Sequence, residues 1–203
     1  MPTNYNDQYY VILRENNNHY PTFNGSLRPR SWRIKEKIEE ISEYEVWLTF
    51  GLGRKNKQSL YVDYHSSGGD SVCSKEFADF ILTLETGGIQ FFKGTHGDVV
   101  EKIKKDYYMM HVHKRIKCID RTKSNLHVDP RTDYIKSIRG FSIDPDLLDR
   151  IPFEDRRIFF LEESAFIKVF HESIVEKIIN TDMKGFRFVK VSQWGDNSAF
   201  NKE

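Results

Sequence analysis

Two stretches of this sequence, offset by 97 residues, share an order of residues that predicts the same strand–helix–strand unit. In residues 72–94 and 169–191, apolar residues at helical spacing precede a glycine, and an extended apolar segment follows it. The matching pairs are Val72 and Val169, Ile81 and Ile178, Gly88 and Gly185, Phe91 and Phe188, and Lys93 and Lys190. Two copies alone do not exclude a chance similarity, but the pattern predicts two related strand–helix–strand halves.

The pattern favours an α+β fold with a mainly antiparallel sheet and two principal packing helices, near residues 74–85 and 172–181. The glycines Gly87–Gly88 and Gly185 are predicted to end these helices and release the chain into a strand. Glycine suits this role because it adopts the left-handed backbone conformation without strain.

Three further segments have a recognisable periodicity. Residues 8–14 alternate as a strand, and residues 31–41 carry isoleucines at helical spacing behind Ser31, a candidate N-cap. Residues 44–51 and 58–65 are predicted to form a hairpin across a basic, glycine-containing loop.

The length of 203 residues fits a single domain, 1–203, and is enough to bury a hydrophobic core. The alternative is a pair of subdomains, 1–96 and 97–203, with the junction near residues 94–105. We find no low-complexity segment that would mark a flexible linker.

Charge and cysteine usage narrow the functional classes. The sequence contains 31 Lys and Arg residues and 30 Asp and Glu residues. The resulting net charge of +1 gives no basic footprint for direct nucleic-acid binding. The N-terminal segment lacks the features of a signal peptide, and no apolar run is long enough to span a membrane. Two cysteines are too few for a disulfide framework, so we expect a reduced, cytoplasmic compartment.

Residues 107–118, YYMMHVHKRIKC, raise the question of a metal site. Alternation along a strand places His111 and His113 on one face, and histidines at i and i+2 can bind one metal ion. Arg115 and Lys117 share that face and would repel a cation, whereas Cys118 lies on the apolar face. We therefore predict a solvated polar face with dispensable histidines and a buried Cys118. A metal protein or enzyme using His111 and His113 stays the alternative.

The next segment, IDRTKSN, is predicted to be a turn held by Asp120 and Ser124. No phosphate-binding loop, dinucleotide fingerprint, HExxH or nucleophile-elbow motif occurs in the sequence. We therefore assign no catalytic residue and no metal ligand.

Three segments together resemble a known family: YYVILR near the start, IKCIDRTKSN in the middle, and RIFFLEESAFIKVFHESIVEKIINTDMKGFRFVKV at the end. They are similar to the bacterial polymorphic-toxin immunity proteins of the family numbered eleven. That family includes a myxobacterial immunity protein and was formerly classified as a domain of unknown function. The likeness covers most of the chain but is loose over the first hundred residues. His171 stands where such proteins often have a Ser or similar cap.

The resemblance implies a non-enzymatic inhibitor without a cofactor. Such proteins are encoded beside a toxin, bind that cognate toxin domain in the producing cell, and block its active site or an essential surface. Because the chain lacks an export signal, the toxin is expected to act in the cytoplasm. A regulatory nucleic-acid-binding module remains a further alternative, since residues 28–37 are locally basic.

The densest acidic segment, residues 144–164, is the predicted toxin interface, because toxins that act on phosphate-bearing substrates often have basic clefts. The interface candidates are Asp149, Glu154, Asp155, Glu162 and Glu163. The competing interpretation is structural. Asp144 and Pro145 have the pattern of an N-cap and first-turn proline, and nearby arginines can neutralise several of the carboxylates.

Overall fold

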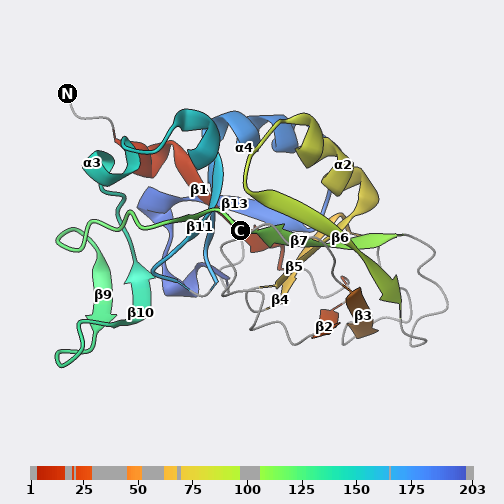
Figure 1. Cartoon of the computed structure of the whole chain (residues 1–203), viewed down its shortest axis with the longest axis horizontal. Helices are drawn as coiled ribbons and strands as arrows, with labels where there is room; N and C mark the ends of the chain where they lie inside the picture. The colour runs from red at the N-terminus through yellow and green to blue at the C-terminus, as the bar shows by residue number, and fades with distance from the viewer. Residues whose placement is uncertain are drawn as a thin grey trace.

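The computed structural model describes residues 4–16, 20, 22–28, 45–51, 62–67, 70–96, 106–164 and 166–199. The predicted helix at 31–41 lies outside the described residues, as do residues 52–61 of the predicted hairpin and most of the predicted junction. The described chain is an α+β protein with mainly antiparallel sheets, which confirms the predicted fold class (Figure 1).

The strands make up most of the regular structure. They are β1 (Tyr9–Arg14), β2 (Thr22–Arg28), β3 (Glu45–Gly51), β4 (Tyr64–Ser67), β5 (Asp70–Ser74), β6 (Ile89–His96), β7 (Tyr107–Val112), β8 (Arg115–Ile116), β9 (Asn125–Val128), β10 (Ile135–Gly140), β11 (Ile158–Leu161), β12 (Lys168–His171) and β13 (Phe186–Lys190). The helices are α2 (Lys75–Thr83), α3 (Pro145–Leu148) and α4 (Glu172–Ile179). The short 3₁₀ segments are η1 (Tyr5–Asp7), η2 (Phe153–Arg156), η3 (Val191–Gln193) and η4 (Asp196–Ala199).

In the described part of the chain, one sheet has five strands in the order β13-β1-β12-β11-β8. The same residues form a second sheet of six strands in the order β2-β3-β6-β7-β5-β4. Neighbours are antiparallel except at the β11–β8 and β3–β6 pairs. The predicted hairpin of residues 44–51 with 58–65 is wrong, because β3 lies between β2 and β6 whereas β4 pairs with β5. Alternation identifies a strand but does not choose its partner.

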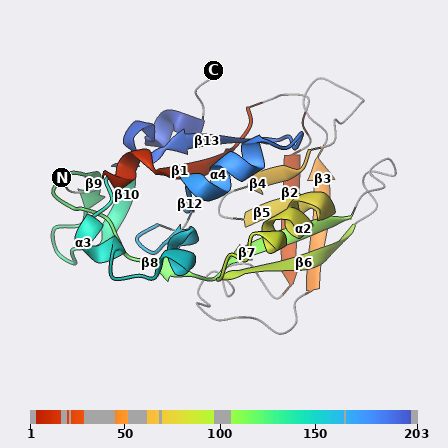
Figure 2. The same ribbon diagram turned by 90° about the horizontal axis from the view of Figure 1, so that it is seen from above.

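The sequence repeat corresponds to a repeat in the structure. The unit β5-α2-β6 in the six-stranded sheet matches the unit β12-α4-β13 in the five-stranded sheet, and α2 and α4 are the two predicted principal helices. In each unit an antiparallel strand separates the other two: β7 lies between β5 and β6, and β1 lies between β12 and β13. Figure 2 shows α2 over the strands of its unit and α4 over those of the other.

Burial follows the same repeat along the two helices. The buried pairs are Phe77 and Ile174, Ala78 and Val175, and Ile81 and Ile178. The next pair, Leu82 and Ile179, is exposed on both helices. The inward face of each helix is therefore set by the same spacing of apolar residues.

Two cores fill the space around the five-stranded sheet. One core joins α2, α4 and the six-stranded sheet to one face of the five-stranded sheet, where Ile12, Phe160 and Phe170 lie. The other core covers the opposite face, where Val11 and Val169 pack under α3 and the segment around Cys118. Neighbouring residues of one strand thus enter different cores, as a sheet buried on both faces requires.

The two repeat glycines open strands and do not end helices. Gly88 has φ +80° and Gly185 has φ +100°, so the predicted positive φ is confirmed. However, α2 already ends at Thr83 and is followed by Glu85 at φ +50°, and α4 ends at Ile179. The predicted glycine helix ends are wrong, because each helix ends several residues before its glycine, with Leu84 and Asn180 as the C-cap residues.

The sheets do not follow the proposed division at residues 96 and 97. β7 follows that point but pairs with β5 and β6, whereas β1 precedes it but pairs with β12 and β13. Each sheet therefore draws strands from both stretches of the chain. A single domain spanning residues 1–203 stays a prediction.

Candidate functional site

The histidine-containing strand β7 is central in its sheet, and its predicted solvated face is wrong at His111. That side chain is 8% exposed, and its ring stacks on His113 with the ring centroids 5.8 Å apart. The ring of Phe92 lies 6.4 Å away from the His111 ring. Alternation predicts which side chains share a face, but the strands packed beside β7 determine whether that face meets water.

The described residues contain no group of three or more His, Cys, Asp or Glu side chains that could hold a metal ion. His111 and His113 therefore lack a third ligand within that part of the chain. After His113 the chain passes from the six-stranded sheet to the five-stranded sheet. The backbone N–H groups of His113 and Lys114 donate to the Gly88 carbonyl at 2.9 and 3.2 Å. His111 and His113 thus lie where the chain passes between the two sheets.

Cys118 is fully buried, as predicted, and burial raises the pKa of its thiol. The following turn is also confirmed. The Asp120 carboxylate accepts the N–H groups of Thr122 and Lys123 at 3.0 and 3.2 Å, and Ser124 Oγ accepts the Ser142 N–H at 2.9 Å. Hydrogen bonds from Thr122, and then from Lys123, hold the pKa of Asp120 well below its usual range. Both polar residues therefore organise the backbone of this turn.

Two of the predicted interface carboxylates are ion-paired within the protein. Asp149 follows α3 and accepts hydrogen bonds from the Tyr5 hydroxyl and, at 2.8 Å, from Arg156. These bonds, led by that of Tyr5, lower the pKa of Asp149. Asp155 lies 3.1 Å from the ammonium group of Lys114, as measured between Oδ2 and Nζ. The competing structural interpretation is thus correct for Asp149, and the predicted N-cap at Asp144 is confirmed.

The other three carboxylates lie in different surroundings. Glu163 turns inward, and its Oε1 accepts the Ile119 N–H at 3.0 Å. Burial raises the pKa of Glu163. Glu154 and Glu162 are exposed, and no ion pair joins either of them to another residue in the described chain. The buried strand β11 separates Glu154 from Glu162, so the structure does not gather the five carboxylates into one patch.

An aromatic cluster beside Glu154 escaped the sequence analysis. Phe153 is 45% exposed, and the edge of its ring meets His171, with the centroids 4.9 Å apart. His171 is the N-cap of α4, as predicted, and its Nδ1 accepts the Ser173 N–H at 3.2 Å. Burial lowers the pKa of His171, with a further contribution from the charges of Arg156 and Arg157. The sequence feature that could have indicated this exposed phenylalanine is its position between Pro152 and two acidic residues.

The geometry defines a class first: an α+β protein in which the polar residues of the sequence motifs cap helices and stabilise turns. The particular family follows from comparison. The model of the Immunity protein family, Imm11, matches residues 7–193. The chain therefore belongs to the Imm11 immunity proteins, as its sequence motifs predicted. A search of curated proteins finds none that matches the chain.

None of the described helices combines the length and the apolar character that a bilayer crossing requires.

Proposed function

We propose that this protein binds a cognate bacterial toxin domain and neutralises it by covering its active site or an essential surface. The single observation that carries the proposal is the family match, which spans residues 7–193. The protein acts as a non-catalytic inhibitor, so its surface, and no cofactor, performs the function. Its partner is a protein.

The proposed site of action is the cytoplasm of the producing cell. Cys73 and Cys118 support this proposal, because both are free thiols and both are fully buried. Reduced cysteines suit a reducing compartment. A toxin that attacks nucleic acid or a nucleotide there would need an inhibitor in the same compartment.

The acidic turn at η2 is our proposed contact with the basic cleft of such a toxin. Phe153 supplies exposed apolar area, and Glu154 supplies a carboxylate without an internal ion pair among the described residues. Asp149 and Asp155 flank it but are held by Arg156 and Lys114. Charge complementarity of this kind accelerates encounter and fixes orientation.

The proposal is tested with the toxin domain encoded beside this chain's gene, expressed with and without the immunity protein. Wild-type protein should restore growth and bind the purified toxin domain. Glu154→Lys should slow association at ordinary salt without loss of stability, because Glu154 holds no partner in the described chain. Glu176→Lys, on the exposed side of α4, makes the same charge change elsewhere and serves as the control.

Failure of the wild-type protein to bind or protect would refute the immunity function itself. Wild-type kinetics for Glu154→Lys would instead remove the acidic turn from the interface and leave the function standing. Reversing Asp149 would confound the result, since it would also break the contacts with Tyr5 and Arg156.

A further inference from the structure

The hairpin of β9 and β10, residues 125–140, projects from the body of the molecule as an arm (Figure 1). Leu126 and Ile138 pack against the second core at the base of this arm. The turn between the strands, residues 129–134, lies at the far end of the hairpin. The arm therefore has an anchored base and a projecting tip.

Hydrogen bonds fix the arm to the body at its base. The Asp120 N–H donates to the Ser142 carbonyl at 2.8 Å, and Ser124 Oγ bridges the same two segments. Asn6, from the other end of the chain, donates to Ser142 Oγ at 2.7 Å and accepts the Ile143 N–H at 2.8 Å. The turn that sequence alone identified thus sets the direction of the arm.

A second set of contacts fixes the tip. Asp129 accepts the Arg131 N–H at 2.9 Å and lies 2.8 Å from the Lys136 ammonium group. The hydrogen bonds from Lys136, and then from the Arg131 backbone, lower the pKa of Asp129. Arg121 binds both carboxylate oxygens of Asp133 at 2.6 and 2.8 Å and holds that residue at φ +57°. Both acidic side chains of the tip, Asp129 and Asp133, are therefore already ion-paired within the protein.

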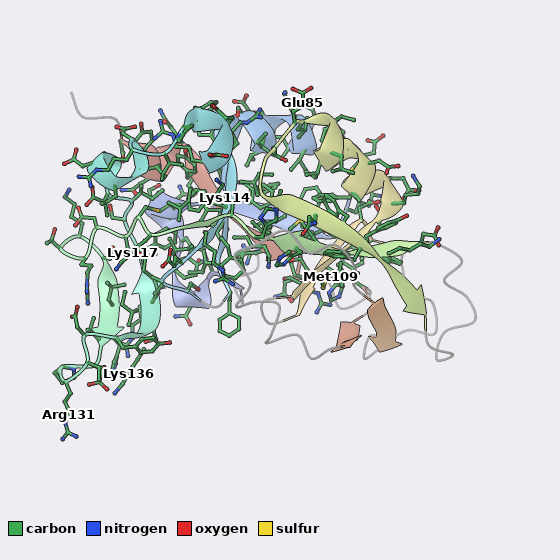
Figure 3. All side chains as sticks on the ribbon, viewed as in Figure 1. Glu85, Met109, Lys114, Lys117, Arg131 and Lys136 are labelled. Carbon is green, nitrogen blue, oxygen red and sulfur yellow. The ribbon has the colours of Figure 1, made fainter. Side chains whose placement is uncertain are left out.

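Two exposed side chains of the tip are suited to bind a partner. Tyr134 is 69% exposed, the highest value among the large apolar or aromatic side chains whose exposure the structure describes. Arg131 extends from the tip into solvent (Figure 3), and no carboxylate pairs with its guanidinium group in the described chain. Tyrosine and arginine are the residue types that most often dominate protein interfaces, and a tip that is already ordered loses little entropy on binding.

We infer that the β9–β10 arm is a docking arm whose Tyr134 and Arg131 bind an acidic patch on a protein partner. The inference rests on the proposed function, which makes that partner the cognate toxin domain. The guanidinium group of Arg131 favours a carboxylate on the partner, because Lys136 and Arg121 already pair with Asp129 and Asp133, the acidic side chains of the tip. A phosphate backbone fits less well, since the turn of residues 129–134 carries one cation, Arg131, whereas proteins that bind a phosphate backbone usually present several.

The test measures binding of the toxin domain encoded beside this chain's gene to wild-type protein and to Arg131→Glu and Tyr134→Ala. Each substitution should weaken binding about tenfold or more, as is typical of a central interface residue. Arg131→Glu should act partly through slower association and lose part of its effect at high salt. Lys177→Glu on α4 and Leu82→Ala on α2 are the matched controls, because both side chains are exposed on the helices.

The outcomes separate the inference from the function. If wild-type protein binds the toxin domain and both arm variants bind equally well, the docking arm is refuted and the immunity function stands. If wild-type protein does not bind, the immunity function fails. A short DNA duplex is the second probe: binding by wild type that Arg131→Glu abolishes would overturn the assignment to a protein partner. Unchanged melting temperatures would confirm that the variants alter contact and not folding.

Discussion

In the unit that contains α2, the strand between β5 and β6 is β7, which follows β6 along the chain. In the unit that contains α4, the corresponding strand is β1, which comes from the opposite end of the chain. Both inserted strands are antiparallel to their neighbours. The comparison teaches that a strand–helix–strand pattern in the sequence predicts the order of its own elements. It does not predict which part of the chain supplies the strand that lies between its two strands.

Each unit also contacts a segment that precedes the other unit along the chain. The segment before β4 meets the loop of the α4 unit, where Asp63 accepts the Lys184 N–H at 2.8 Å. The segment before β11 meets the loop of the α2 unit, where Arg157 donates to the Glu85 carbonyl at 2.6 Å. Each repeat glycine lies in one of these loops, so the same residue type faces different neighbours.

The largest expected effect comes from breaking the glycine of the α4 unit. In Gly185→Val, the new Cβ would lie 2.4 Å from the Tyr64 carbonyl oxygen and 2.8 Å from Val62 Cβ, at φ +100°. We expect the free energy of unfolding to fall by about 3 kcal/mol or more, which lowers the melting temperature by about 6–12 °C. Urea unfolding and thermal melting measure the change.

Gly88→Val is the matched variant in the α2 unit and should cost less, about 2 kcal/mol. Its new Cβ would meet Lys114 Cβ at 2.3 Å, but the next contacts, with Lys114 Cα and N, are longer at 3.3 Å, whereas the Cβ at position 185 would meet a second atom, Val62 Cβ, at 2.8 Å. An equal or larger loss for Gly88→Val would contradict this ranking of the two environments.

The N-caps provide the next contrast. Ser74 is fully buried, accepts the Phe77 N–H at 3.0 Å and donates to Asp63 at 2.9 Å. Ser74→Ala should therefore reduce the free energy of unfolding by about 2 kcal/mol, from the lost cap and the unsatisfied Asp63 oxygen. Chemical denaturation measures it, and a loss below about 0.5 kcal/mol would show that neighbouring groups replace both bonds.

His171, the equivalent cap of α4, should make stability depend on pH. Its pKa is lowered in the folded protein, mainly by burial, whereas an unfolded imidazole titrates near about 6.5. The unfolded state then binds more protons, so stability falls as pH decreases from about 6.5 through the folded pKa, and stays constant below it. Protonation also removes Nδ1 as the acceptor for the Ser173 N–H.

His171→Ser tests this difference directly, because it gives the α4 unit the cap residue of the α2 unit. The free energy of unfolding of the wild type, relative to that of the variant, should decrease as the pH falls from about 7 to about 5, the range in which the imidazole titrates. An NMR titration of the His171 ring provides an independent value. A difference in stability that does not vary with pH would exclude His171 as the source.

The smallest effect is expected on the outer faces of the helices. Leu82 and Ile179 are 57% and 58% exposed at equivalent positions of the repeat. Leu82→Gln and Ile179→Gln should each change the free energy of unfolding by less than about 0.5 kcal/mol. The preceding residues, Ile81 and Ile178, are fully buried, so the same substitution there should be strongly destabilising. A loss above about 1 kcal/mol at Leu82 or Ile179 would place that position in a contact.

The sequence by itself determined those features that depend on neighbours along the chain. The spacing of Ile81 and Ile178 placed the two main helices, and the two glycines marked positive φ values. Asp120 and Asp144 are close in sequence to the N–H groups that they accept, so their turn and cap could be predicted. The family motif followed from the same local patterns.

Only the tertiary structure decided which strands pair and which charged side chains are held by contacts within the protein. The pairing of β3 with β6 and the insertion of β1 beside β12 join residues distant in sequence, and alternation does not choose among such partners. Asp149 meets Tyr5 across 144 positions of the chain, which removes one predicted interface carboxylate from a free surface. His111 became buried for the same reason: burial depends on the elements that pack against a strand, and a short sequence window does not contain them.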